Sequence, residues 1–234
     1  MGKEIRSYRK TAISVGVLYI IGTVAGVLSR FFSGPILSDQ NYLAKVSENQ
    51  NLAIASLLVL TMSFSLAMMS VFLFPILKKY NETLALGVVL FRGALEAVMY
   101  IAGVIIWLLL LAVSHEYVKA GAPTVSYFQT FGAILLKTSV QTGAIVSIVF
   151  SLGALMIYYV FYQSKLIPKW LSGWGIIGAL PYLAAGIIGV FGTNLEILMM
   201  PLALQEMVMA VWLIVKGFNQ SAIASLSNIY KSSN

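Results

Sequence analysis

Six long, almost uncharged apolar runs divide the chain and leave few folds open to it. An α-helix rises ~1.5 Å per residue, so ~20 residues cross the ~30 Å hydrocarbon layer of a bilayer. The runs do not alternate apolar with polar residues, as the strands of a membrane barrel do. The sequence therefore predicts an all-α polytopic membrane protein, one domain over residues 1–234 in which six transmembrane helices form a bundle. The predicted spans lie near 10–32, 52–77, 84–113, 138–162, 170–192 and 195–216.

Composition agrees with this class, because 59% of the 234 residues are hydrophobic and only 10% are charged. Soluble domains average about 25% charged residues, so this chain has too few polar side chains to cover itself in water. The first apolar run is too long for a signal peptide, and Ser29 to Phe32 offers no small-residue cleavage site. The first helix is therefore expected to be a permanent span.

The positions of the basic residues predict the orientation. The net charge of +7 taken alone suggests a nucleic acid or another anionic partner. An excess of Lys and Arg, however, marks the cytoplasmic side of a membrane protein. One side of the predicted layout carries Lys3, Arg6, Arg9, Lys10, Lys78, Lys79, Lys165, Lys169, Lys216 and Lys231, and the other carries Arg30, Lys45, Lys119 and Lys137. Both termini are thus expected in the cytoplasm, and nucleic-acid binding is disfavoured.

Several classes of chemistry lack their residues. The chain has no cysteine and a single histidine, which excludes disulfides, thiolate catalysis and multi-histidine metal sites. No Ser-His-Asp set, carboxylate cleft or Walker loop can be assembled. We therefore expect no catalytic residues, no metal and no cofactor, and an enzyme is disfavoured.

Charged residues inside the apolar runs are the strongest indication of function. Arg92 and Glu96 lie one helical turn apart in the third run, on a face that continues through Tyr100, and Glu206 interrupts the sixth run. Ionisable groups within the hydrocarbon are costly and usually mark pathways or binding sites. We expect Arg92, Glu96 and Glu206 to converge, together with Gln205, Gln141 and Tyr100, in a buried polar site that binds a ligand or a proton.

The alternative is a purely structural ion pair, in which Arg92 extends to the interface and Glu96 neutralises it. A charge at a helix centre costs ~2.5 to 3.5 kcal/mol on insertion scales, and each Leu, Ile or Val offsets ~0.3 to 0.6 kcal/mol. The eleven such residues between Gly93 and Val113 give roughly 5 kcal/mol, enough for one central charge but hardly for two. Arg92 is therefore expected nearer the cytoplasmic interface than the midplane.

Three weaker patterns favour structure over function. His115 and Glu116 resemble an acid-base pair, but a lone loop histidine is more often solvated. Gly173, Gly175 and Gly178 spell G-x-G-x-x-G without a preceding strand, which indicates close helix packing in place of dinucleotide binding. The two outer connections, residues 33–51 and 114–129, could each carry a short interfacial helix, and the amphipathic residues 124–136, which join the fourth span, are the better candidate.

Three segments carry a resemblance to a known family. They are the F-R-x-x-x-E run from Phe91, the connector from Tyr162 through Pro168 to Trp170, and the E-x-x-x-x-x-W-L-x-V-K-G run from Glu206. Together they resemble the DUF4386 family of uncharacterised prokaryotic multi-pass membrane proteins, although Gln163 stands where the family motif usually has a basic residue. The resemblance implies a six-helix protein of the prokaryotic plasma membrane, and it implies no substrate, cofactor or catalytic residue.

Two functions remain open. The first is a protein whose partner, besides the lipid bilayer, is a small molecule or ion that it binds or transports at the buried charges. The second is a structural or regulatory bundle that binds lipid or a partner membrane protein through faces of small residues.

Single cysteines test the topology, because the chain has none of its own. In intact cells Ser7→Cys and Ser233→Cys should be protected from a membrane-impermeant maleimide, whereas Ser38→Cys and Ala122→Cys should be labelled. Labelling of one tail without the other would contradict an even number of spans.

Overall fold

Long helices account for most of the protein, because backbone in contact with lipid must satisfy its own hydrogen bonds. The computed structural model describes residues 2–48, 50–123 and 127–232, and side chains between Tyr8 and Ser227. Within the described residues six helical stretches are long and apolar enough to cross a membrane, which agrees with the predicted number. They span Tyr8–Leu37, Asn51–Leu77, Glu82–Lys119, Tyr127–Ser164, Lys169–Val190 and Glu196–Val215.

Two of the six stretches are composite. The third consists of α4 (Glu82–Val88), the π-helix η1 (Val89–Leu95) and α5 (Glu96–Lys119). The sixth begins with a short 3-10 segment, η2 (Glu196–Met199), and continues as α8 (Met200–Val215). The others are α1 (Gly2–Leu37), α3 (Asn51–Leu77), α6 (Tyr127–Ser164) and α7 (Lys169–Val190).

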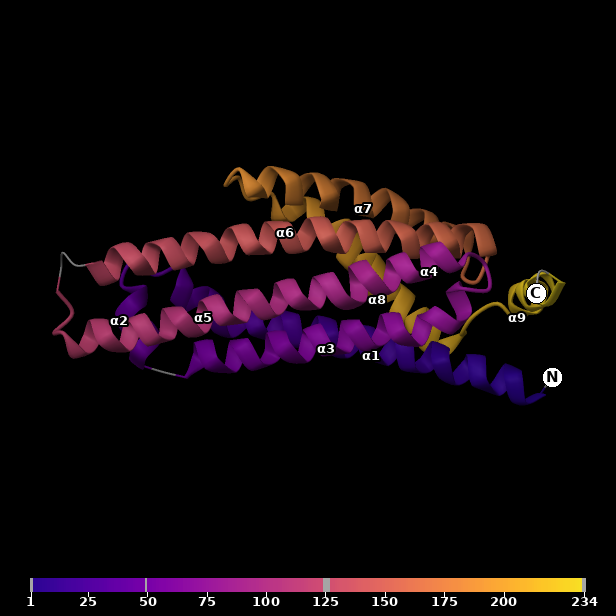
Figure 1. Ribbon diagram of the computed structural model, residues 1–234, viewed down its shortest axis with the longest axis horizontal. Coiled ribbons are helices and arrows are strands. Elements are labelled where there is room, and N and C mark those ends of the chain that lie inside the picture. Colours follow the sequence, from indigo (N-terminus) through magenta and orange to yellow (C-terminus); the bar gives the residue numbers. More distant parts are fainter. Residues whose placement is uncertain (1, 49, 124–126, 233–234) are drawn as a thin grey trace.

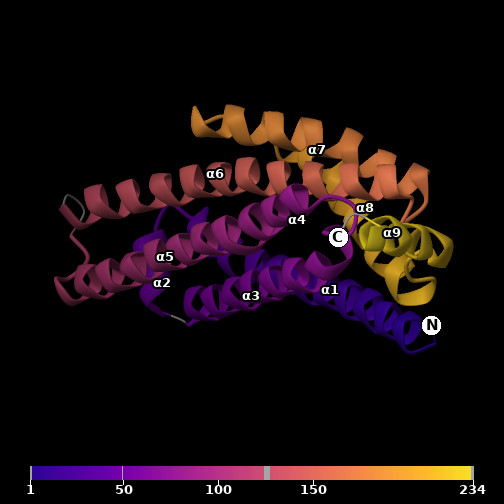
Figure 2. The ribbon, with the colours of Figure 1, turned by 45° about the vertical axis from the view of Figure 1, so that its right-hand side comes forward.

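The helices form an elongated bundle in which α8 joins two groups. Helix α1 packs along α3, and α6 packs along both α5 and α7. Helix α8 contacts α1 on one side and α7 on the other, and it crosses obliquely behind the other helices in Figure 1. The view in Figure 2 shows α7 outside α6 and the pair α1 and α3 on the opposite side of the bundle. Residues carried by η1, α6, α1 and α8 can thus meet in the interior.

One end of the bundle holds the start of α1, the connections α3–α4, α6–α7 and α8–α9, and helix α9 (Gln220–Ser232) (Figure 1). We call it the basic end, because Lys10, Lys78, Lys79, Lys165, Lys169 and Lys216 lie there. The start of α1 and helix α9 therefore lie at the same end, as six spans require. Arg9 closes this end of α8 by donating to the carbonyl oxygens of Leu213 and Ile214, at 3.3 Å and 2.6 Å.

The opposite end carries a short helix in one of the two connections for which the sequence allowed it, but not in the one that was preferred. The short helix there is α2 (Tyr42–Glu48), in the first connection, where it buries Leu43 and Val46 against α5. The predicted interfacial helix over residues 124–136 is wrong as a separate element, because residues from Tyr127 onward are the first turns of α6, while 124–126 lie outside the described residues. With 38 residues each, the third and fourth stretches are about 57 Å long, so they extend well beyond a ~30 Å core.

Candidate functional site

Arg92 is at the centre of the buried polar groups. It lies in η1, the only π-helical segment among the described residues, and π-helical segments occur frequently at functional sites. Its side chain is 0% exposed. Such complete enclosure excludes the interpretation in which Arg92 extends to the interface.

The guanidinium of Arg92 is shared by two carboxylates from different spans. Its Nη1 donates to both oxygens of Glu96, at 2.8 Å and 3.0 Å, and its Nη2 donates to Glu206 Oε1 at 3.2 Å. Glu96 is one turn further along the same helix, whereas Glu206 comes from α8. The structure therefore brings the three charged residues together, and they link the third span to the sixth.

The cluster lies deep in the bundle. Ten residues separate Glu206 from Lys216 at the basic end, which is about 15 Å of helix and half of a ~30 Å core. The predicted position of Arg92 nearer the cytoplasmic interface than the midplane stays a prediction. Carboxylates on two helices would also allow it to lie deeper, because they compensate the charge.

Aromatic rings and a glycine enclose the guanidinium. The Cζ atom of Arg92 lies 4.3 Å from the centroid of the Phe150 ring and 5.8 Å from that of Tyr19, distances typical of cation–π contacts. A Cβ on Gly153 of α6 would lie 2.5 Å from Arg92 Cγ and 3.1 Å from its backbone nitrogen. Gly153 thus provides the space that the arginine side chain occupies.

Three buried polar atoms in this region make no hydrogen bond of regular geometry among the described residues: Arg92 Nε and the hydroxyls of Tyr19 and Tyr158. Both tyrosines interact electrostatically with Arg92 and Glu206. A buried donor or acceptor left unsatisfied costs about 1 to 3 kcal/mol. The Tyr19 hydroxyl nevertheless lies within reach of Arg92 and of Tyr158, and the Tyr158 hydroxyl lies within reach of Glu206. These groups are therefore poorly hydrogen-bonded in the structure, and a water molecule or small ligand would give them better partners.

Charge counting gives the chemistry of the cluster. One guanidinium and two carboxylates carry a net charge of −1 when all three are ionised. An uncompensated buried charge is strongly unfavourable, so a group in such a place takes up a compensating charge or becomes neutral. The cluster is suited to hold one proton or one cation. The cluster contains only two carboxylates. Among the described residues, no three His, Cys, Asp or Glu side chains lie together where they could hold a metal ion.

Of the other predicted site residues, one lies in the cluster and two lie outside it. The Tyr100 hydroxyl lies within hydrogen-bonding reach of Glu96, and so belongs to the cluster. Gln205 is fully buried but faces α7, where its Nε2 donates to the Leu171 carbonyl at 3.0 Å. Gln141 precedes Phe150 by nine residues on α6, about 14 Å along the axis. The structure therefore leaves both glutamines out of the cluster.

Tyr19, Tyr158 and Phe150 also belong to this region and were not among the predicted site residues. Tyrosine is enriched at membrane interfaces, yet Tyr19 and Tyr158 are at most 1% exposed in the interior of their helices. Tyrosines placed well inside apolar runs were the available signal.

The weaker sequence patterns take structural roles. A Cβ on Gly175 would meet the Tyr158 ring at 2.5 Å, and one on Gly178 would meet the Leu202 backbone at 3.2 Å, which confirms close packing for the G-x-G-x-x-G run. His115 is exposed near the end of α5, away from the cluster.

Comparison with known proteins identifies a family. Residues 14–217 match the family described as "Domain of unknown function (DUF4386)". This range contains Arg92, Glu96 and Glu206. No curated protein and no solved structure matches the chain.

Enlarging Gly153 should disturb the cluster selectively. Gly153→Ala places a methyl group against Arg92 Cγ and its backbone nitrogen, and overpacking of this kind typically costs about 1 to 3 kcal/mol. Gly143→Ala on the same helix is the matched control, because nothing lies within 4 Å of its Cβ position. Thermal unfolding in detergent should show a lower midpoint for Gly153→Ala only, and equal midpoints would contradict the tight fit of Arg92.

Proposed function

The chain belongs to the DUF4386 family, and we propose that it binds a small ion or molecule at the Arg92–Glu96–Glu206 cluster and couples this binding, or the ligand's transport, to protonation of a carboxylate. The observation that carries the proposal is the sharing of one buried guanidinium by two carboxylates. We place the protein in the prokaryotic plasma membrane, with the site open in turn to the two sides.

The two carboxylates are unequal partners of Arg92. Glu96 receives two hydrogen bonds from one nitrogen, at 2.8 Å and 3.0 Å, and its side chain is 1% exposed. Glu206 receives a single bond at 3.2 Å and its side chain is 12% exposed. Glu206 is therefore the carboxylate that exchanges a proton or cation, and Glu96 is the one that holds Arg92 in place.

Protonation of Glu206 gives a simple coupling step. A neutral Glu206 loses its charge attraction to Arg92, while the ion pair of Arg92 with Glu96 within the third span persists. Helix α8 is then held to η1 by packing and a weaker hydrogen bond only. A ligand that hydrogen-bonds to Arg92 Nε and to the tyrosine hydroxyls would compete with Glu206 for Arg92. Its binding would therefore favour protonation of Glu206, and protonation of Glu206 would favour its binding.

The second candidate is a structural or regulatory bundle, in which the same three residues fasten the third span to the sixth. The complete enclosure of Arg92 favours it. In that case the charge state of the cluster is fixed once the protein has folded, and it does not respond to the bulk pH.

Infrared difference spectroscopy distinguishes the two. In reconstituted protein a carboxylic-acid C=O band should grow as the pH is lowered and should shift after exchange into D₂O, because Glu206 takes up a proton from the medium. Glu206→Gln should remove the component of the band that Glu206 contributes, while the exposed carboxylates keep contributing theirs.

Glu196→Gln removes the same charge from the start of the sixth stretch, where the carboxylate is exposed and pairs with Arg30 at 3.1 Å. This control should retain the component that Glu206 contributes. A band that is absent, insensitive to pH, or unchanged in Glu206→Gln would reject proton exchange at Glu206 and favour the structural bundle.

A further inference from the structure

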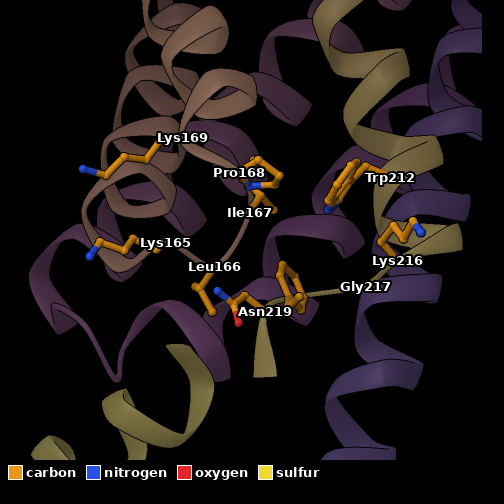
Figure 3. Close-up of a pocket in the computed structure, with 10 residues that line it drawn as sticks. Lys165, Leu166, Ile167, Pro168, Lys169, Trp212, Lys216, Gly217 and Asn219 are labelled. Carbon is orange, nitrogen blue, oxygen red and sulfur yellow. The ribbon is translucent and has the colours of Figure 1, made fainter. Parts of the chain in front are cut away.

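A second feature, separate from the charged cluster, is a pocket of about 400 Å³ at the basic end. It lies between the α6–α7 connection, residues 165–169, and the α8–α9 connection, residues 216–219, with Trp212 as a wall (Figure 3). No residue of the Arg92 cluster lines it.

Backbone geometry fixes the shape of this pocket. Lys165 ends α6 with a φ of 57°, and Gly217 ends α8 with a φ of 75°, so both connections turn sharply. The Asn219 backbone nitrogen donates to the Leu166 carbonyl at 2.8 Å and joins the two connections. Phe218 is buried beside Phe161, with ring centroids 6.0 Å apart. The pocket is therefore built from anchored segments.

The rim of the pocket is basic. Lys165 and Lys169 lie on one side and Lys216 on the other, and Figure 3 shows their amino groups pointing outward from the pocket. Within the described part of the chain, none of these three lysines pairs with a carboxylate. Lys169 Nζ lies 5.2 Å from the centroid of the Tyr162 ring, and the charge of the three lysines is not neutralised by a carboxylate, so an anion from outside the protein can compensate it.

An apolar groove continues from this pocket along α8. It has a volume of about 450 Å³, shares Trp212 and Lys216 with the pocket, and is otherwise lined by Met207, Val208, Val211 and Val215. The Trp212 and Trp170 rings meet edge to face, with centroids 6.3 Å apart, and tryptophan is typical of the headgroup level of a membrane. A basic pocket at that level with an apolar groove running inward matches a phospholipid in shape and polarity.

We propose that the pocket and the groove together bind one anionic phospholipid. The flexible lysine side chains turn inward from the positions in Figure 3 to contact the headgroup phosphate, whose negative charge no choline cation offsets, and an acyl chain lies along α8 beside Val211. Basic pockets between helices on the cytoplasmic side of a membrane are known to bind anionic headgroups, and the basic end is the side expected to be cytoplasmic.

Native mass spectrometry of the detergent-purified protein tests the proposal, with phosphatidylglycerol and phosphatidylcholine added in equal amounts. The wild type should retain one phosphatidylglycerol in preference to phosphatidylcholine. Each basic residue near an anionic headgroup contributes about a fivefold change in affinity, so Lys169→Gln with Lys216→Gln should weaken retention roughly 25-fold. Lys10→Gln with Lys78→Gln, at the same end but outside the pocket, should leave retention within about twofold.

A second pair of variants tests the groove. Val211→Phe should lower retention severalfold by filling the space along α8, whereas Val71→Phe, at an equally exposed position of α3, should not. Equal retention of the two lipids by the wild type, equal losses in the two lysine pairs, equal losses in the two valine variants, or displacement of the lipid by excess inorganic phosphate would each overturn the proposal.

Discussion

A buried guanidinium needs negatively charged groups in contact with it, and in this protein these groups come from two different spans. Arg92 is held by Glu96 on its own helix and by Glu206 on α8, at 2.8 Å and 3.2 Å. Leaving either side unpaired would cost several kcal/mol in so dry a place. The positions of the third and sixth spans are therefore tied to each other, and the remaining helices pack around that link.

Much of the local packing follows from the size of Arg92. Gly153 leaves α6 without a side chain where the arginine stem passes, and Gly93, next to Arg92, lies where a Cβ would meet Ser70 of α3 at 2.5 Å. Phe150 and Tyr19 then cover the guanidinium from α6 and α1. Four helices thus approach closely at one level of the bundle. Small residues permit this contact, and they matter because the hydrophobic effect does not drive helix association within a bilayer. The tyrosine hydroxyls at this level make no hydrogen bond of regular geometry, and the proposed ligand would bind by hydrogen-bonding to them.

The sequence predicted those parts of the fold that depend on local properties. Apolar length set the number and approximate positions of the spans, and one-turn spacing set the pairing of Arg92 with Glu96. Glu206 was a candidate partner of Arg92 only because it is an acidic residue within an apolar run. The rotation and depth of one helix against another were not predictable. Gln205 therefore faces α7 although it adjoins Glu206, Gln141 lies too far along α6, and Tyr19 and Tyr158 went unnoticed. The π-helical turn at Arg92 has no sequence signature.

The central claim is that Arg92 and Glu206 stabilise each other across two spans, and a double-mutant cycle measures this directly. Arg92→Met, Glu206→Leu and the double variant would be unfolded reversibly in mixed detergent micelles, and the three losses of unfolding free energy compared. Partners in direct contact show interaction energies of about 0.5 to 3 kcal/mol, so the double variant should be more stable than the sum of the single losses implies, by at least about 1 kcal/mol. Losses that add to within about 0.5 kcal/mol would show that the two residues act independently and would contradict the account.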